Sequence, residues 1–175
     1  GVQGGDWGAV VSSWLAFDHP KQEDSGVLGL HLNMMGLRPG IDLKTASLSA
    51  DEQAWLAKMG GALDDKTAYQ RIHATRPQTL GVALTDSPVG LAAWIAEKFQ
   101  AWSDCSGDPL KRFSMDLLLD NIMVYWLTGT AGTATWLYRG AAQQKPRALP
   151  EGAKVETPTA FAAFPADIAP APPRE

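Results

Sequence analysis

The sequence predicts an α/β fold in which a parallel sheet carries a long insertion of helices. Three observations lead to this prediction. A glycine-rich turn joins a short stretch of small and apolar residues to an amphipathic helix at the start of the chain. A second apolar stretch at residues 27–36 completes a βαβ unit, whose crossover should be right-handed. A helical region then separates this unit from a third apolar stretch at residues 155–168.

Composition limits the classes of protein that this chain can belong to. It has 175 residues, of which 45% are hydrophobic and 19% are charged, as in an ordinary globular domain. The formal net charge of −4 gives no electrostatic support to a nucleic-acid partner. Cys105 is the single cysteine, so an internal disulfide is excluded and we expect an inert thiol. No unbroken apolar run reaches the ~20 residues of a membrane-spanning helix.

The turn in VQGGDWGA places Asp6 between the first apolar stretch and a helix that Pro20 closes. Val10, Trp14 and Phe17 recur at the three- and four-residue spacing of a half-buried helix face. The glycines around the aspartate would relieve crowding in a tight turn. On these features alone Asp6 fits an N-cap residue, because backbone N–H groups and the helix dipole favour an acidic residue there.

Two apolar stretches are predicted to be strands of the parallel sheet. Residues 27–36, VLGLHLNMMG, are nearly continuous in apolar residues, which is typical of a strand buried on both faces. His31 lies within this stretch, and we expect it to be buried and hydrogen-bonded. Residues 155–168 give a further buried strand with Asp167 just past its end.

Helix signals fill the region between these strands. Ser49 and Glu52 have the spacing of a capping box, at the start of a helix that we expect to end at Gly60 and Gly61. Further helices are predicted over residues 64–74, from Ser87-Pro88 to about Trp102, from about Ser114 through MDLLLDNIMVYWLTG, and over residues 133–139.

In an α/β protein, an insertion of this kind usually covers the C-terminal edge of the sheet, where sites form. We therefore divide the chain into three parts. Residues 1–36 belong to the core, residues 37–143 form a helical cap with its return helices, and residues 144–175 return to the core with a strand and its loop.

Five stretches resemble, in the same order, the epoxide hydrolases of the α/β-hydrolase fold, most closely those of the microsomal type. They are VQGGDWGA, GLHLNM at 29–34, TLGVALTDSPVGLAAWIAEKF at 79–99, NIMVYWLTGT at 121–130 and PTAFAAFPADI at 158–168. The resemblance covers nearly the whole chain. It implies a partial α/β-hydrolase fold of three layers, with the cap inserted after the strand that follows the nucleophile helix.

The resemblance also implies roles for individual residues. Asp6 would be the nucleophile that opens an epoxide and forms an aspartyl ester, with the backbone N–H of Trp7 in the oxyanion hole. Tyr69 and Tyr138 would be the two cap tyrosines that donate a proton to the epoxide oxygen, since a phenol is neutral at pH 7 and can donate. Asp167 would orient a histidine base. No metal or organic cofactor is implied.

The remaining tyrosine and the histidines of the chain fit the catalytic roles of this family less well. Tyr125 lies in an apolar helix and is expected in the core, and for Tyr69 and Tyr138 the competing role is ordinary packing. The expected His-Gly-x-Pro motif and the histidine of a Gly-Gly-His-Phe motif are missing. None of the histidines has matching surroundings: His19, His31 and His73. We therefore expect an internal piece of a longer protein, marginally folded and nearly inactive by itself.

The predicted reaction is the hydrolysis of a small apolar epoxide by water to a vicinal diol, as in detoxification and the metabolism of aromatic and xenobiotic compounds. A haloalkane dehalogenase competes with this prediction, because it shares an aspartate followed by tryptophan and uses indoles to cradle a halide. The cap offers several indoles: Trp55, Trp94, Trp102 and Trp136. Two further candidates are a non-catalytic binder of apolar ligands and a helical interaction module. We expect a cytoplasmic location, with membrane association of a full-length relative left open.

Overall fold

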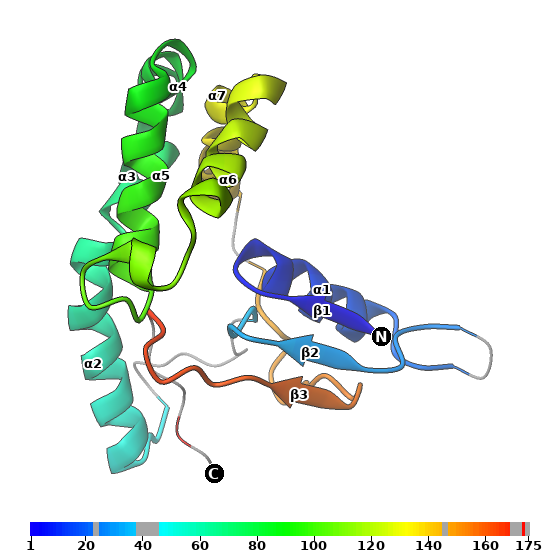
Figure 1. The fold of residues 1–175 in the computed structure, drawn as a ribbon. Coiled ribbons are helices and arrows are strands. Elements are labelled where there is room, and N and C mark those ends of the chain that lie inside the picture. The colour runs from blue at the N-terminus through cyan, green and yellow to red at the C-terminus, as the bar shows by residue number, and fades with distance from the viewer. Residues whose placement is uncertain (23–24, 38–45, 145–146, 169–172, 174–175) are drawn as a thin grey trace. The chain divides into compact units, whose positions relative to one another are not determined.

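The computed structural model describes residues 1–22, 25–37, 46–144, 147–168 and 173, which form two compact units (Figure 1). The sheet unit comprises Gly1–Gln53, Arg147–Pro165 and Ala171–Glu175, and the helical unit comprises Ala54–Pro146 and Ala166–Pro170, each as far as its residues are described. The parallel strands and the many helices agree with the predicted α/β class.

The sheet unit is built on three short parallel strands in the order β1-β2-β3. They are β1 (Val2–Gly4), β2 (Leu30–Leu32) and β3 (Thr159–Phe161). Gln3 lies opposite His31, which in turn lies opposite Ala160. Helix α1 (Trp7–Asp18) connects β1 to β2, so the predicted strand-helix-strand order is confirmed.

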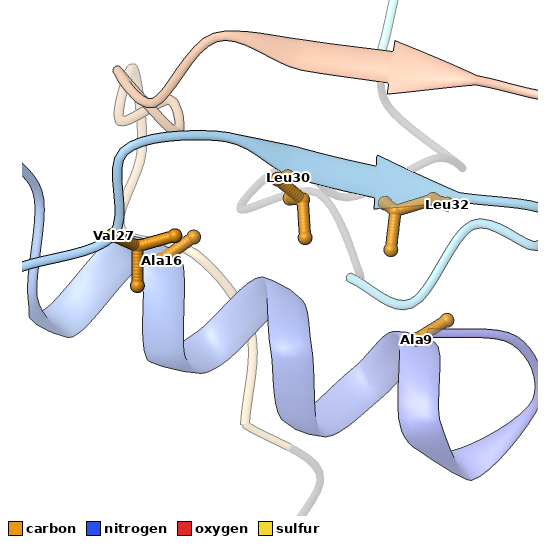
Figure 2. Close-up of a cluster of buried hydrophobic side chains, with 5 residues drawn as sticks. All are labelled: Ala9, Ala16, Val27, Leu30 and Leu32. Carbon is orange, nitrogen blue, oxygen red and sulfur yellow. The ribbon is translucent and has the colours of Figure 1, made fainter. Parts of the chain in front are cut away.

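One face of the sheet packs against α1. Figure 2 shows the residues that form this core, with the alanines on the helix facing the leucines of β2: Ala9, Ala16, Val27, Leu30 and Leu32. Small side chains on the helix allow its backbone to approach the strands closely. The half-buried face predicted for α1 lies beside this stripe, since Val10, Trp14 and Phe17 are all half-buried.

Two predictions about the strands are wrong. Leu30 and Leu32 are buried, but His31 between them is exposed, so β2 alternates rather than being buried on both faces. Alternate side chains of a strand point to opposite faces, and only the face toward α1 is covered at β2 by the described residues. Similarly β3 is shorter than the stretch 155–168, and its three residues are exposed.

Helices make up most of the helical unit. In chain order they are α2 (Ala50–Lys66), α3 (Ala68–Thr75), α4 (Pro77–Asp86), α5 (Pro88–Trp102), the short 3-10 helix η1 (Pro109–Lys111), α6 (Met115–Thr128), α7 (Ala131–Ala134) and α8 (Trp136–Gln143). Helix α3 packs against α8, α4 against α7, and α5 against α6. A core of Leu84, Leu91, Ile122 and Ala131 lies among these helices, and Tyr125 packs against it as expected.

Local capping signals in the sequence identify three helix starts correctly. The N–H of Ser49 donates to Glu52 at 2.7 Å, and the N–H of Glu52 donates to the Ser49 hydroxyl at 3.2 Å, which is the predicted capping box. Ser87 and Ser114 each accept a hydrogen bond from the backbone N–H three residues later. These caps satisfy donors that the first turn of a helix leaves open.

Two boundaries in this region differ from the prediction. Helix α2 does not end at Gly60 and Gly61 but continues to Lys66. A glycine inside a helix costs about 1 kcal/mol relative to alanine, which favourable neighbours can offset. As a result the next helix begins at Ala68 and not at residue 64.

Helices α4 and α5 meet at Ser87 with a bend of 114°. No single helix among the described residues is long and apolar enough to cross a membrane, while this bent pair meets that test by length and composition. Helix α4 was not among the predicted helices. Its Gly81 faces Gly132 of α7, where a Cβ added to Gly81 would lie 3.2 Å from the Gly132 Cα. The two glycines therefore allow α4 and α7 to pack backbone to backbone.

Candidate active site

Asp6 occupies a sharp turn between β1 and α1. Its backbone has φ 47° and ψ −128°, a region that residues with a side chain rarely adopt. Such a conformation costs on the order of 1–3 kcal/mol and is concentrated at functional sites. A Cβ on Gly4 would overlap the carbonyl group of Gly8, so a glycine is required at the end of β1 for the chain to turn this tightly.

The carboxylate of Asp6 does not cap the helix that it precedes. Asp6 stands at the N-cap position of α1, but its side chain accepts no capping hydrogen bond there and is exposed. The interpretation of Asp6 as a capping residue is therefore wrong. The turn instead presents the carboxylate at the N-terminus of a 12-residue helix, where the helix dipole favours negative charge. Trp7, half-buried, is the first residue of that helix.

The structure brings together the two tyrosines predicted for the site. Tyr69 lies on α3 and Tyr138 on α8, and their hydroxyl oxygens share a hydrogen bond of 2.9 Å. The two rings meet edge to face, with centroids 5.5 Å apart. Both side chains are half-buried. Two phenol groups separated by 69 positions in the chain thus converge on one point of the helical unit.

His73 lies one turn after Tyr69 and contacts both tyrosine rings. The ring centroids are 5.3 Å apart for Tyr69 and 5.0 Å apart for Tyr138, and the imidazole also stacks on Trp94 at 5.9 Å. His73 is only 7% exposed, and neither ring nitrogen has a hydrogen-bond partner among the described residues. Burial, and next the positive charge of Lys98, lower the pKa of His73, which keeps the imidazole neutral at pH 7.

Lys98 lies over the same aromatic cluster. Its Nζ is 4.9 Å from the ring centroid of Tyr69, 5.5 Å from that of Trp102 and 5.6 Å from that of Trp94. The side chain is 20% exposed and forms an ion pair with Glu97. The sequence interpretation did not include Lys98, although Trp94, Lys98 and Trp102 are spaced four apart on one helix and so share a face.

Asp167 lies six residues beyond the end of β3, in a half-buried position. Its Oδ1 accepts a hydrogen bond of 2.6 Å from the backbone N–H of Ile168. This segment groups with the helical unit, whereas Asp6 belongs to the sheet unit. The role of Asp167 in orienting a base, like that of the Trp7 N–H in an oxyanion hole, stays a prediction.

Comparison with curated proteins identifies relatives of the whole chain. A Stigmatella aurantiaca (strain DW4/3-1) protein named "Putative epoxide hydrolase" is 42% identical over 173 residues, covering 99% of this chain and 37% of its own length. Epoxide hydrolase 1 of Oryctolagus cuniculus is 38% identical over 188 residues, covering 95% of this chain and 40% of its own length. The chain thus spans about two fifths of the length of these relatives. No protein-family model matches it.

Comparison with solved structures also identifies epoxide hydrolases. An enantioselective mutant of the Aspergillus niger epoxide hydrolase matches with a TM-score of 0.70 and 31% identity, over 97% of this chain and 41% of the solved one. The juvenile hormone epoxide hydrolase of the silkworm Bombyx mori matches with a TM-score of 0.63 and 32% identity, over 80% of this chain and 36% of the solved one. The chain is therefore a homologue of the epoxide hydrolases and has the α/β-hydrolase fold.

Proposed function

We propose that this chain supplies the nucleophile and the acid groups of an epoxide hydrolase that converts an apolar epoxide and water into a vicinal diol. The hydrogen bond of 2.9 Å between Tyr69 and Tyr138 is the observation that carries the proposal. Two phenols at one point can both donate to a single oxygen atom, and an epoxide offers one such oxygen at its reacting centre. The surrounding rings of Trp94 and Trp102 favour an apolar substrate.

The first step in this proposal is nucleophilic attack by Asp6. An oxygen of its carboxylate bonds to one epoxide carbon while the bond between that carbon and the epoxide oxygen breaks. The released alkoxide takes a proton from one phenol and a hydrogen bond from the other. The resulting phenolate regains its proton from water. The strained turn at Asp6 supports this role, because it exposes a carboxylate that no helix cap requires.

The second step is hydrolysis of the aspartyl ester. Water attacks the ester carbonyl carbon and a base accepts its proton, while the Trp7 N–H at the start of α1 stabilises the oxyanion. Collapse of the tetrahedral intermediate breaks the bond between the carbonyl carbon and the diol oxygen, which takes the proton held by the base. The carboxylic acid of Asp6 then loses its proton to water, which restores the carboxylate. Asp167 would orient the base. We assign the role of the base to none of the histidines of this chain. His73, for example, lies buried among the tyrosines of the helical unit.

The test is a comparison of two substrates with a protein that contains these 175 residues. We expect styrene oxide to give the diol, 1-chlorobutane to release no chloride, and Asp6→Asn to abolish turnover. Chloride release without diol formation would instead indicate a haloalkane dehalogenase. Binding of styrene oxide without either product would indicate a non-catalytic binder. The 175 residues expressed alone should form the ester but release diol very slowly.

A further inference from the structure

We propose that Lys98 is a positioning residue for the tyrosine pair, whose ammonium charge stabilises the negative charge that develops on the epoxide oxygen held by Tyr69 and Tyr138. The inference deepens the proposed function and rests on it. Lys98 does not touch the reacting atoms in this account. It acts through the ring of Tyr69, over which its ammonium group lies.

The position of the ammonium group is fixed by three aromatic rings. A cation within about 6 Å of a ring centroid is attracted to the ring face, and Lys98 meets this condition for Tyr69, Trp94 and Trp102. Its side chain is mostly removed from solvent, being 20% exposed, so its charge is less screened than that of a surface lysine. The charge is therefore held beside the ring of Tyr69, and solvent screens it less than the charge of a surface lysine.

Other charged groups near this cluster do not cancel the effect. Glu97 pairs with Lys98, but its side chain is 53% exposed, so solvent screens its carboxylate more strongly. Arg139 on α8 donates to the carbonyl group of Ala74 at 3.1 Å and is exposed. His73 is neutral at pH 7, and its pKa is lowered first by burial and second by Lys98. The field of Lys98 thus reaches the rings that surround the two hydroxyl groups.

The timing of charge development distinguishes this role from simple packing. The epoxide and both phenols are neutral before the ring opens, and negative charge appears on the oxygen only as the bond to carbon breaks. A positive charge nearby therefore stabilises the transition state and hardly affects the bound substrate. Removing it should lower the rate of ester formation and leave the dissociation constant of the epoxide unchanged.

Three variants separate charge from packing in an active protein that contains this chain. Lys98→Met removes the charge but keeps an unbranched side chain that packs well on aromatic rings. Lys98→Arg keeps a cation over the rings. Lys111→Met makes the same change in net charge at an exposed residue of η1. In single-turnover experiments we expect Lys98→Met to slow ester formation about tenfold. Lys98→Arg and Lys111→Met should stay within about threefold of the parent.

A series of epoxides provides a second kinetic readout. Electron-withdrawing substituents stabilise the alkoxide by themselves, so the defect of Lys98→Met should shrink as such substituents are added. A defect of equal size with every epoxide would overturn the proposal. A weaker affinity of Lys98→Met for the epoxide that accounts for the whole defect would also overturn it. A loss of thermal stability that occurs in both Lys98→Met and Lys98→Arg would overturn it as well.

A binding measurement separates failure of this inference from failure of the proposed function. Phenylacetate and phenylacetamide have nearly the same shape, but only the first is negatively charged. We expect Lys98→Met to weaken phenylacetate binding about tenfold and to leave phenylacetamide binding within about twofold, as followed by tryptophan fluorescence. If the protein gives this binding result but opens no epoxide, the proposed hydrolase function is refuted and the proposed role of Lys98 is retained. Equal effects on both ligands, or no binding of the anion by the parent protein, would overturn the role of Lys98.

Discussion

Replacing Asp6 by glycine should stabilise the sheet unit while removing the carboxylate on which the proposed chemistry depends. The backbone of Asp6, at φ 47° and ψ −128°, costs a residue with a Cβ on the order of 1–3 kcal/mol. Glycine adopts this conformation without that cost, but its greater freedom in the unfolded chain offsets about 0.5–1 kcal/mol of the gain in stability. Asp6→Gly should therefore exceed Asp6→Ala in free energy of unfolding by about 1 kcal/mol, because alanine keeps the Cβ but lacks the carboxylate.

Urea denaturation of the two variants, followed by circular dichroism and by tryptophan fluorescence, measures this difference. Asp120 provides the matched control, since it is exposed in the middle of α6. There the order should reverse, with Asp120→Ala more stable than Asp120→Gly by about 1 kcal/mol. If alanine at position 6 is as stable as glycine or more so, the turn is not strained and the structural argument for the nucleophile fails.

Three further predictions concern the helical unit. Thr135→Val should lower the free energy of unfolding by about 1–2 kcal/mol in urea denaturation, because Thr135 is 1% exposed and its hydroxyl donates to the carbonyl groups of Gly132 and Pro77. His73 has a lowered pKa, so the unfolded chain binds its proton more readily and stability should fall as the pH drops below 6.5. Between pH 7.5 and pH 5, the free energy of unfolding should fall less in His73→Gln than in the parent protein, and an equal fall in both would contradict this. Tyr69→Phe and Tyr138→Phe should each slow ester formation, and the double variant should slow it roughly 10²–10⁴-fold, measured by quenched single turnover; a double variant at the parent rate would remove both phenols from the mechanism.

The parts of the fold that could be predicted from the sequence depend on local interactions. Three helices begin with hydrogen bonds between residues three positions apart, at Ser49 with Glu52, at Ser87 and at Ser114. The sequence pattern alone therefore identifies these helix starts. The end of α2 was missed because the cost of a glycine is small enough for the surroundings to offset. The exposure of His31 was missed because it depends on what covers each face of the sheet, which a single strand does not encode.

The candidate site was predictable to a different extent at each residue. The residues around Asp6 are compatible both with a helix cap and with a strained turn, and only the backbone dihedrals and the missing capping bond distinguish them. Tyr69 and Tyr138 were identified by family resemblance, but their contact depends on the packing of α3 against α8. Lys98 had a readable signal in its spacing from Trp94 and Trp102, although spacing alone cannot show that its ammonium group reaches Tyr69.

The most direct test of the nucleophilic role of Asp6 is the fate of an oxygen label in a single turnover. An active protein containing these residues, in excess over styrene oxide, is allowed to react once in water enriched in ¹⁸O. If Asp6 forms the ester and water attacks its carbonyl carbon, the label enters the Asp6 carboxylate and the diol formed in that turnover is unlabelled. Label in the diol with none in the peptide that contains Asp6 would show direct attack of water on the epoxide and would contradict the account.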